Sequence, residues 1–318
     1  MKLPGYEDVI EASKRINDIV HRTPVLTSSS LNEIAGCEIY FKCENFQRAG
    51  SFKMRGASNS VFQLSDDEAA KGVATHSSGN FAQALALAAK LRGIKAEIVM
   101  PRTAPKAKVE AVRGYGGNIT FCEPTLEARE TTLNEIIDEK GCTFLHPYDN
   151  FNVISGQGTA AKEMLEDIPM PDIVMAPVGG GGLISGTSLA AKGISEEIIV
   201  TGAEPAGADD ARKSMKLGYI VPSVNPDTIA DGLLTSLGKL TFPIMQRNVT
   251  KIFTVNDEMI IKAMRLIWQR MKIIVEPSAA VPFAVILDNK LFFKDKKAGV
   301  ILSGGNLDLE KLPWTVNE

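Results

Sequence analysis

The stretch Asp172-Ile-Val-Met-Ala-Pro-Val-Gly-Gly-Gly-Gly-Leu-Ile-Ser-Gly-Thr-Ser-Leu-Ala-Ala-Lys192 decides the fold. An apolar run typical of a buried strand passes into four consecutive glycines, and helical periodicity follows them. Without side chains, the backbone N–H groups of the loop can converge on an anion at the positive end of the helix. The spacing matches neither a Walker loop nor a dinucleotide fingerprint. A tight turn needs only one or two glycines, whereas this loop has four. The loop therefore predicts a phosphate site for a ligand other than a nucleotide bound by either of those motifs.

Short apolar runs alternate with helical patterns along the rest of the chain. Helical spacing of apolar residues is clear over residues 80–90 and 258–271. This alternation is typical of βαβ units and predicts an α/β fold with largely parallel sheets. The predicted strands are 38–43, 73–76, 96–100, 118–122, 173–176, 198–202 and 298–302.

Composition limits the classes of partner. The 318 residues are 44% hydrophobic and 23% charged, which is enough for a large core and predicts two lobes. The net charge is −3 without a long basic run, so we expect no nucleic acid or anionic membrane partner. No apolar stretch approaches the roughly 18 residues of a membrane span. The sequence predicts a cytoplasmic protein with a small polar substrate, whose Cys37, Cys43, Cys122 and Cys142 are reduced core thiols.

Three further motifs carry polar residues at the ends of predicted strands or the starts of helices. Lys53 follows a Gly-Ser turn in Gln47-Arg-Ala-Gly-Ser-Phe-Lys-Met-Arg-Gly56, and Ser51 is a candidate N-cap for a helix there. The lysine is either a solvated helix residue or a Schiff-base amine. Ser77-Ser-Gly-Asn80 is either an ordinary helix cap or an anion site, and Ser303-Gly-Gly-Asn306 is either a β-turn or part of a site.

In this order, the motifs resemble the fold type II pyridoxal-phosphate enzymes, in the serine racemase and serine/threonine dehydratase branch. The resemblance covers nearly the whole chain and includes Arg22-Thr-Pro-Val25, Ser155-Gly-Gln-Gly-Thr159, Ala230-Asp-Gly232 and Glu276-Pro-Ser278. It implies a tryptophan synthase β-like α/β fold with two parallel-sheet lobes and the active site between them. The large lobe would comprise residues 1–47 and 145–318, and the small mobile lobe residues 48–144. Pyridoxal 5′-phosphate and a homodimer are also implied.

The resemblance implies a role for each motif. Lys53 would hold the cofactor covalently and act as a catalytic base, with Phe52 beside it as a cofactor contact. Asn80 would contact the 3′-oxygen, and Ser303 would face the ring nitrogen. The phosphate would rest on Gly179, Gly180, Gly181 and Gly182, and the substrate would be bound by Ser77, Ser78, Asn80 and Gln83, with Ser236 as a further candidate.

Two activities compete on these residues. Dehydration of L-serine, L-threonine or a related 3-hydroxy amino acid would give a 2-oxo acid and ammonia. Racemisation of serine, aspartate or hydroxyaspartate would use Lys53 and Ser78 as bases on the two faces. Phe81 stands where the family often has histidine, and Tyr148-Asp149 resembles the dehydratase form, so the sequence favours the dehydratase, including one for 3-hydroxyaspartate. A cysteine synthase-type enzyme and a non-enzymatic phosphometabolite-binding protein remain as competing interpretations.

A divalent cation site is also implied by the resemblance. Glu204, the Ala208 carbonyl and Asp210 correspond to a loop that binds Mg²⁺ or Ca²⁺ through oxygen ligands, which suit a hard cation. The competing interpretation is a solvated acidic loop. Lys272 and Tyr115 stand at positions that fit an interface nucleotide, whereas Ala49 departs from that pattern. We expect His21, His76 and His146 to be structural.

Overall fold

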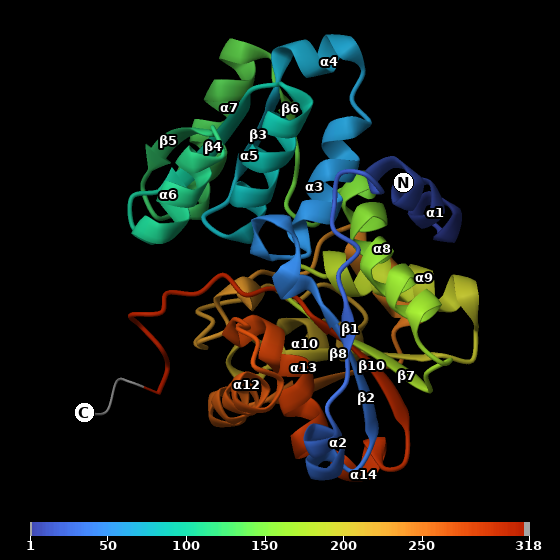
Figure 1. Cartoon of the computed structure of the whole chain (residues 1–318). Helices are drawn as coiled ribbons and strands as arrows, with labels where there is room; N and C mark the ends of the chain where they lie inside the picture. The colour runs from blue at the N-terminus through green and yellow to red at the C-terminus, as the bar shows by residue number, and fades with distance from the viewer. Residues whose placement is uncertain (1, 315–318) are drawn as a thin grey trace.

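The structure, a computed structural model, describes residues 2–314, and two sheets organise this part of the chain (Figure 1). The larger sheet has the strand order β1 (Val25–Leu26), β2 (Glu38–Cys43), β10 (Lys297–Leu302), β7 (Ile173–Pro177), β8 (Ile199–Pro205) and β9 (Lys251–Val255). The smaller sheet has the order β5 (Asn118–Cys122), β4 (Ala96–Pro101), β3 (Val73–His76) and β6 (Thr143–Phe144).

The predicted strands and their parallel pairing are confirmed. All seven are present within a few residues of their predicted ends, and every pairing is parallel except that of β1 with β2. The sequence did not indicate β1, β6 and β9. The first two are only two residues long, and β9 carries exposed Lys251 at the edge of its sheet, so none of the three gives a long apolar run.

Helices cover both faces of the larger sheet. One core, on one face of this sheet, is shared with α2, α12 and α13, and a second core on the other face is shared with α1, α8, α9 and α11. The helices are α1 (Tyr6–Ile16), α2 (Ser29–Ala35), α3 (Lys53–Phe62), α4 (Asp66–Lys71), α5 (Asn80–Arg92), α6 (Lys106–Gly114), α7 (Leu126–Lys140), α8 (Phe151–Asp167), α9 (Gly182–Ile194), α10 (Asp210–Leu217), α11 (Thr241–Asn248), α12 (Asp257–Met271), α13 (Pro277–Asp288) and α14 (Lys290–Phe293), with short 3₁₀ turns η1 (Glu44–Phe46), η2 (Arg48–Gly50), η3 (Ala206–Ala208) and η4 (Asp231–Leu233).

Glycines hold α3 and α9 tightly against α8. A Cβ atom on Gly156 would lie 2.7 Å from the Cα of Gly56, and one on Gly186 would lie 2.5 Å from the amide nitrogen of Gly158. These close approaches exclude larger residues and fix the three helices relative to one another. Because α3 begins at Lys53 and α9 begins at the glycine loop, the packing sets where these two predicted site segments lie.

The four cysteines are buried and free, as predicted. Within residues 2–314, no helix is both long enough and apolar enough to cross a bilayer.

Candidate active site

Lys53 is placed next to the end of β10 by a short stretch of sheet pairing. Ser51 forms a bridge with Gly304, and the Phe52 amide donates to the Ser303 carbonyl at 3.0 Å. These contacts bring together two predicted cofactor residues from opposite ends of the chain. The helix starts at Lys53, but the expected role of Ser51 as its N-cap is wrong. Phe52 is the cap residue, and the buried Ser51 hydroxyl has no hydrogen-bond partner among the described residues.

Lys53 is half-buried, and its amine lies in a largely apolar environment. Its Nζ donates to the Pro147 carbonyl at 2.9 Å and lies 5.1 Å and 5.8 Å from the ring centres of Phe52 and Phe81. Burial lowers the pKa of Lys53 to about 8, although the negative charge of Glu276 acts in the opposite direction. Roughly a tenth to a fifth of the amine is then neutral near physiological pH, far more than for an ordinary lysine, and a nucleophilic or basic amine requires this neutral form.

The glycine loop joins β7 to α9 and has no room for side chains. A Cβ on Gly180 would lie 2.4 Å from the ring of Tyr148, and one on Gly181, whose φ is +87°, would lie 2.8 Å from Thr241 Oγ1. The first N–H groups of α9 have no partners within the helix. A bare loop at a helix N-terminus, together with a buried amine, fits the phosphate and the aldehyde of pyridoxal phosphate.

The loop after β3 and the start of α5 carry the residues that the sequence predicts to bind the substrate. Ser77 Oγ accepts a hydrogen bond from the Gly79 amide at 3.4 Å, and Ser78 follows Ser77 directly. Asn80 begins α5, and Gln83 lies one turn further on, where it is buried. Ser236, by contrast, lies in the loop after η4, where its hydroxyl accepts from the Ser223 amide at 2.8 Å.

Asn80 makes contacts that the sequence did not assign. Its Nδ2 donates to both oxygens of Glu276, at 2.9 Å and 3.1 Å, and its Oδ1 accepts from Asn306 Nδ2 at 3.0 Å. The only sequence signals for Glu276 and Asn306 are their positions in the Glu-Pro-Ser and Ser-Gly-Gly-Asn motifs.

The segment from His146 to Asp149 connects Lys53, the glycine loop and the loop before α11. The Asp149 carboxylate accepts from the amides of Lys239 at 3.0 Å and Leu240 at 2.7 Å. His146 Nδ1 accepts from the Asp149 amide at 2.9 Å, and burial lowers the pKa of His146 to about 4. The imidazole is therefore neutral at physiological pH, with its proton on Nε2.

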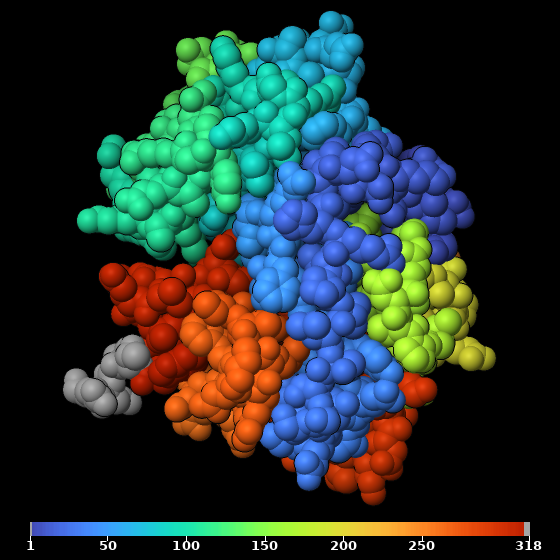
Figure 2. All heavy atoms as spheres, in the orientation of Figure 1, coloured from blue at the N-terminus to red at the C-terminus, as the bar shows by residue number. Residues whose placement is uncertain are grey.

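The parts built on the two sheets meet along a seam that crosses the face of the molecule in Figure 2. Lys108 of α6 forms an ion pair across it with Asp231 of η4. Since Asp231 precedes the Gly232 and Leu233 backbone that packs against Gly179, the pair lies near the glycine loop.

The predicted cation loop has a buried pair of carboxylates. Glu204 accepts from the Ala211 and Arg212 amides at 2.9 Å and 3.0 Å, whereas neither oxygen of Asp210 has a hydrogen bond of good geometry. Burial raises the pKa of Glu204 to about 8 and that of Asp210 to about 6, the latter despite the nearby Ser223 hydroxyl. Buried Ala208 lies between them in the chain. The orphaned carboxylate fits a cation, although no group of three or more His, Cys, Asp or Glu side chains converges in the described residues.

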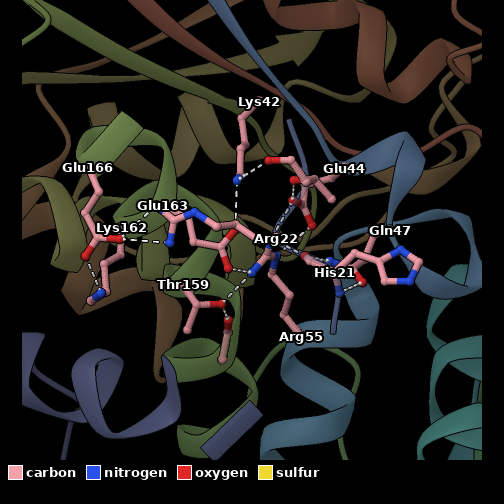
Figure 3. A network of polar contacts seen from close by, with 12 residues as sticks. His21, Arg22, Lys42, Glu44, Gln47, Arg55, Thr159, Lys162, Glu163 and Glu166 are labelled. Carbon is pink, nitrogen blue, oxygen red and sulfur yellow. Dashed lines mark hydrogen bonds and ion pairs between the residues drawn. The ribbon is translucent and has the colours of Figure 1, made fainter. Parts of the chain in front are cut away.

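A buried charge network centres on Arg55, which follows Lys53 by two residues in α3 (Figure 3). Arg55 is fully buried and makes paired hydrogen bonds to the carboxylates of Glu44 and Glu163 at 2.7 Å to 2.8 Å. Lys42 also binds Glu163 at 2.7 Å, and Thr23 donates to Glu44. The two cations balance the two carboxylates and tie α3 to β2, η1 and α8. Sequence patterns do not indicate these long-range pairs.

Comparison with known proteins supports the resemblance. Residues 16–304 match the pyridoxal-phosphate dependent enzyme family. The chain is 52% identical to the β-hydroxyaspartate dehydratase of Paracoccus denitrificans over 99% of its own length and 100% of the relative. It is 48% identical to the L-threo-3-hydroxyaspartate ammonia-lyase of Saccharomyces cerevisiae, over 98% and 96% of the two chains. The crystal structure of serine racemase from Dictyostelium discoideum superposes with a TM-score of 0.93 at 50% identity, over 96% and 99% of the two chains.

Proposed function

Because the chain belongs to the pyridoxal-phosphate dependent enzyme family, we propose that it is an ammonia-lyase that converts 3-hydroxy amino acids to 2-oxo acids and ammonia. The observation that carries the proposal is the buried Lys53 amine, whose pKa lies near 8 and whose neighbouring backbone is paired with Ser303. A phosphometabolite carrier would have no use for such a desolvated amine.

Each residue of the site has its own task. Lys53 would hold the cofactor covalently and, once released, would take the proton from the substrate Cα. When bound, pyridoxal phosphate supplies the electron sink for the negative charge left on Cα. Gly179–Gly182 would hold its phosphate, Asn80 would contact its 3′-oxygen and Ser303 its ring nitrogen, and Phe52 would pack beside it. Ser303 offers a neutral hydroxyl where a carboxylate would keep the ring protonated, and this favours rapid loss of the β-hydroxyl.

We propose 3-hydroxyaspartate as the first substrate to test. The two relatives named for hydroxyaspartate elimination cover nearly the full length of this chain, and L-serine and L-threonine are the next candidates. Ser77, Ser78, Asn80 and Gln83 would bind the α-carboxylate beside the N-terminus of α5. Ser236 remains a candidate for the β-substituent.

Racemisation is the second candidate function, because serine racemase of Dictyostelium discoideum is 50% identical over 98% of the chain. In that reaction Lys53 would act on one face of Cα and Ser78 on the other. Elimination needs only the first base, so a change at Ser78 separates the two activities.

The test is an incubation of purified protein with L-serine, D-serine, L-threonine and the isomers of 3-hydroxyaspartate. Release of 2-oxo acid and formation of the enantiomer are followed together. We expect borohydride reduction and mass spectrometry to find the cofactor on Lys53, and Lys53→Ala to abolish turnover. Ser78→Ala should remove racemisation and retain elimination. An unmodified Lys53 in the reduced protein would overturn the proposal.

The remaining assignments are proposed on the same basis. Glu204, the Ala208 carbonyl and Asp210 would hold Mg²⁺ or Ca²⁺ together with water, and the Asp210 oxygens, which lack hydrogen bonds of good geometry, support this.

We propose that residues 48–144 form a small lobe that closes on a large lobe of residues 1–47 and 145–318. Residues 1 and 315–318 of the large lobe lie outside the described part of the chain. A homodimer in the cytoplasm is the proposed state, and light scattering tests the dimer.

A further inference from the structure

Glu276 is a buried carboxylate with no ion-pair partner in the described part of the chain. It is 3% exposed and precedes Pro277 at the start of α13, where its side chain makes no capping hydrogen bond. Its carboxylate instead crosses to the smaller-sheet side of the seam and accepts from Asn80 Nδ2 at 2.9 Å and 3.1 Å. Burying an unpaired carboxylate costs stability, and groups of this kind cluster at functional sites.

The backbone around Glu276 holds the carboxylate in place. The Glu276 amide donates to the Gly304 carbonyl at 3.0 Å. A Cβ on Gly304 would lie 2.8 Å from Glu276 Oε1 and 3.0 Å from Ser51 Cβ. The carboxylate is therefore fixed between the Lys53 segment and the end of β10.

Hydrogen bonds around Asn80 determine the direction in which its amide points. Asn306 Nδ2 donates to the Ala49 carbonyl at 2.7 Å and to Asn80 Oδ1 at 3.0 Å. The Ala49 carbonyl can only accept, so the group of Asn306 that contacts it is the NH₂. The same NH₂ contacts Asn80, so the Asn80 atom on this side is the oxygen. When ionised, the Glu276 carboxylate can only accept, so in that state it selects the nitrogen end of Asn80. Donor and acceptor roles agree along the whole chain of hydrogen bonds from Ala49 to Glu276.

The charges that face Glu276 come from both sides of the seam. Burial, and then the charge of Asp231, raise the pKa of Glu276 to about 7, whereas the Asn80 hydrogen bond and the charge of Lys108 oppose the rise. Lys53 also faces it, because Glu276 raises the pKa of that amine. The carboxylate is thus electrostatically coupled to Lys53 as well as hydrogen-bonded to Asn80.

We propose that Glu276 is the positioning residue for Asn80: its carboxylate fixes the amide so that a second Nδ2–H remains to donate to the bound cofactor. The inference rests on the proposed function, because it takes the cofactor contact of Asn80 as given. With Glu276 in place, Asn80 Oδ1 is occupied by Asn306 and one N–H serves the carboxylate. Without it, only the Asn306 hydrogen bond opposes rotation of the amide oxygen toward the cofactor 3′-oxygen, where two acceptors would repel.

The experiment is a double-mutant cycle on cofactor affinity with Glu276→Met and Asn80→Ala, alone and combined. Apoprotein is titrated with pyridoxal phosphate, and both the dissociation constant and the visible absorption maximum of the bound cofactor are recorded. Glu276→Met should weaken binding about tenfold or more and shift the absorption maximum, since Asn80 loses the charged acceptor that orients its amide toward the cofactor. In the Asn80→Ala background the same substitution should change affinity less than about twofold.

A conservative variant separates positioning from folding. Glu276→Gln retains an acceptor oxygen, so we expect it to recover a large part of the affinity and the wild-type absorption maximum. The melting temperature of the Glu276→Met apoprotein should not fall below that of wild type. Additive effects of the two substitutions, or wild-type affinity and absorption in Glu276→Met, would overturn the inference. If wild-type protein carries no cofactor on Lys53 after borohydride reduction, the proposed function itself fails.

Discussion

Replacing Arg55 by methionine is expected to destabilise the protein strongly, although none of the hydrogen bonds that the structure describes for its side chain goes to a proposed cofactor residue. Arg55 is the only described cation that bonds to Glu44, and it shares Glu163 with Lys42. Methionine keeps a similar length but leaves two buried carboxylates facing one ammonium group. Breaking a buried pair by removing one partner destabilises by about 3–5 kcal/mol, because an uncompensated charge remains in the interior.

Urea unfolding of the apoprotein at a fixed protein concentration measures the effect, with the slope of the transition checked for constancy. Arg22→Met is the matched control. Arg22 pairs with Glu166 and Asp167 on the surface, and its side chain is 53% exposed, so the loss should stay within about 1 kcal/mol. The melting temperature of Arg55→Met should fall by about 10 °C relative to this control.

A second variant tests charge balance rather than packing. Glu44→Gln combined with Arg55→Met leaves Lys42 and Glu163 as a balanced pair. The double variant should therefore be more stable than Arg55→Met alone. The reasoning fails if Arg55→Met is no less stable than Arg22→Met, or if Glu44→Gln lowers stability further in the Arg55→Met background.

Three further predictions concern the site itself. The pKa of Lys53, about 8 in the folded apoprotein, lies below its ordinary value, so its burial destabilises at low pH and this penalty disappears as pH rises from about 8 toward 10.5. Lys53→Met should accordingly stabilise the apoprotein by up to about 3 kcal/mol near pH 7 and by much less near pH 10.5, and a pH-independent difference in urea unfolding would contradict this. Gly181→Ala should weaken cofactor binding and lower stability by about 1–3 kcal/mol, since φ is +87° and the new Cβ would meet Thr241 Oγ1 at 2.8 Å; an unchanged melting curve and dissociation constant would refute it. Chelation should lower activity and melting temperature, with recovery on adding Mg²⁺, whereas an Asp210→Asn protein should not respond to chelator; indifference of the wild type would remove the cation site.

The sequence was most informative where local chemistry dominates. Buried parallel strands give continuous apolar runs, so strands such as 38–43 and 73–76 were predicted with their correct ends. The four glycines at the start of α9 indicated their loop because no ordinary turn needs so many. The sequence did not indicate the short edge strands β1 and β6 or the edge strand β9, because their stability comes from neighbouring strands.

What the sequence could not indicate is the set of contacts between distant segments. Asn80 and Glu276 are hydrogen-bonded across the seam, although nothing in either motif names the other. Tyr148, from a different part of the chain, leaves no room for a side chain on Gly180, and Arg55 forms an ion pair with Glu163 on α8. Such pairs depend on how α3, α8 and α9 pack, and this packing is settled by glycine contacts that have no periodic signature.

The two sets of buried charges in this protein differ in a way that separates stability from chemistry. Around Arg55 burial opposes ionisation, but pairing outweighs it: the pKa of the guanidinium rises and that of Glu163 falls, so both groups stay ionised. Lys53 and Glu276 have no such partners, and burial moves both pKa values toward physiological pH. Ion pairs of this kind keep Arg55 and Glu163 charged, whereas a buried group without an ion-pair partner can gain or lose a proton near physiological pH. Lys53 is therefore where we expect proton transfer, and the network around Arg55 keeps the helix that carries Lys53 in place.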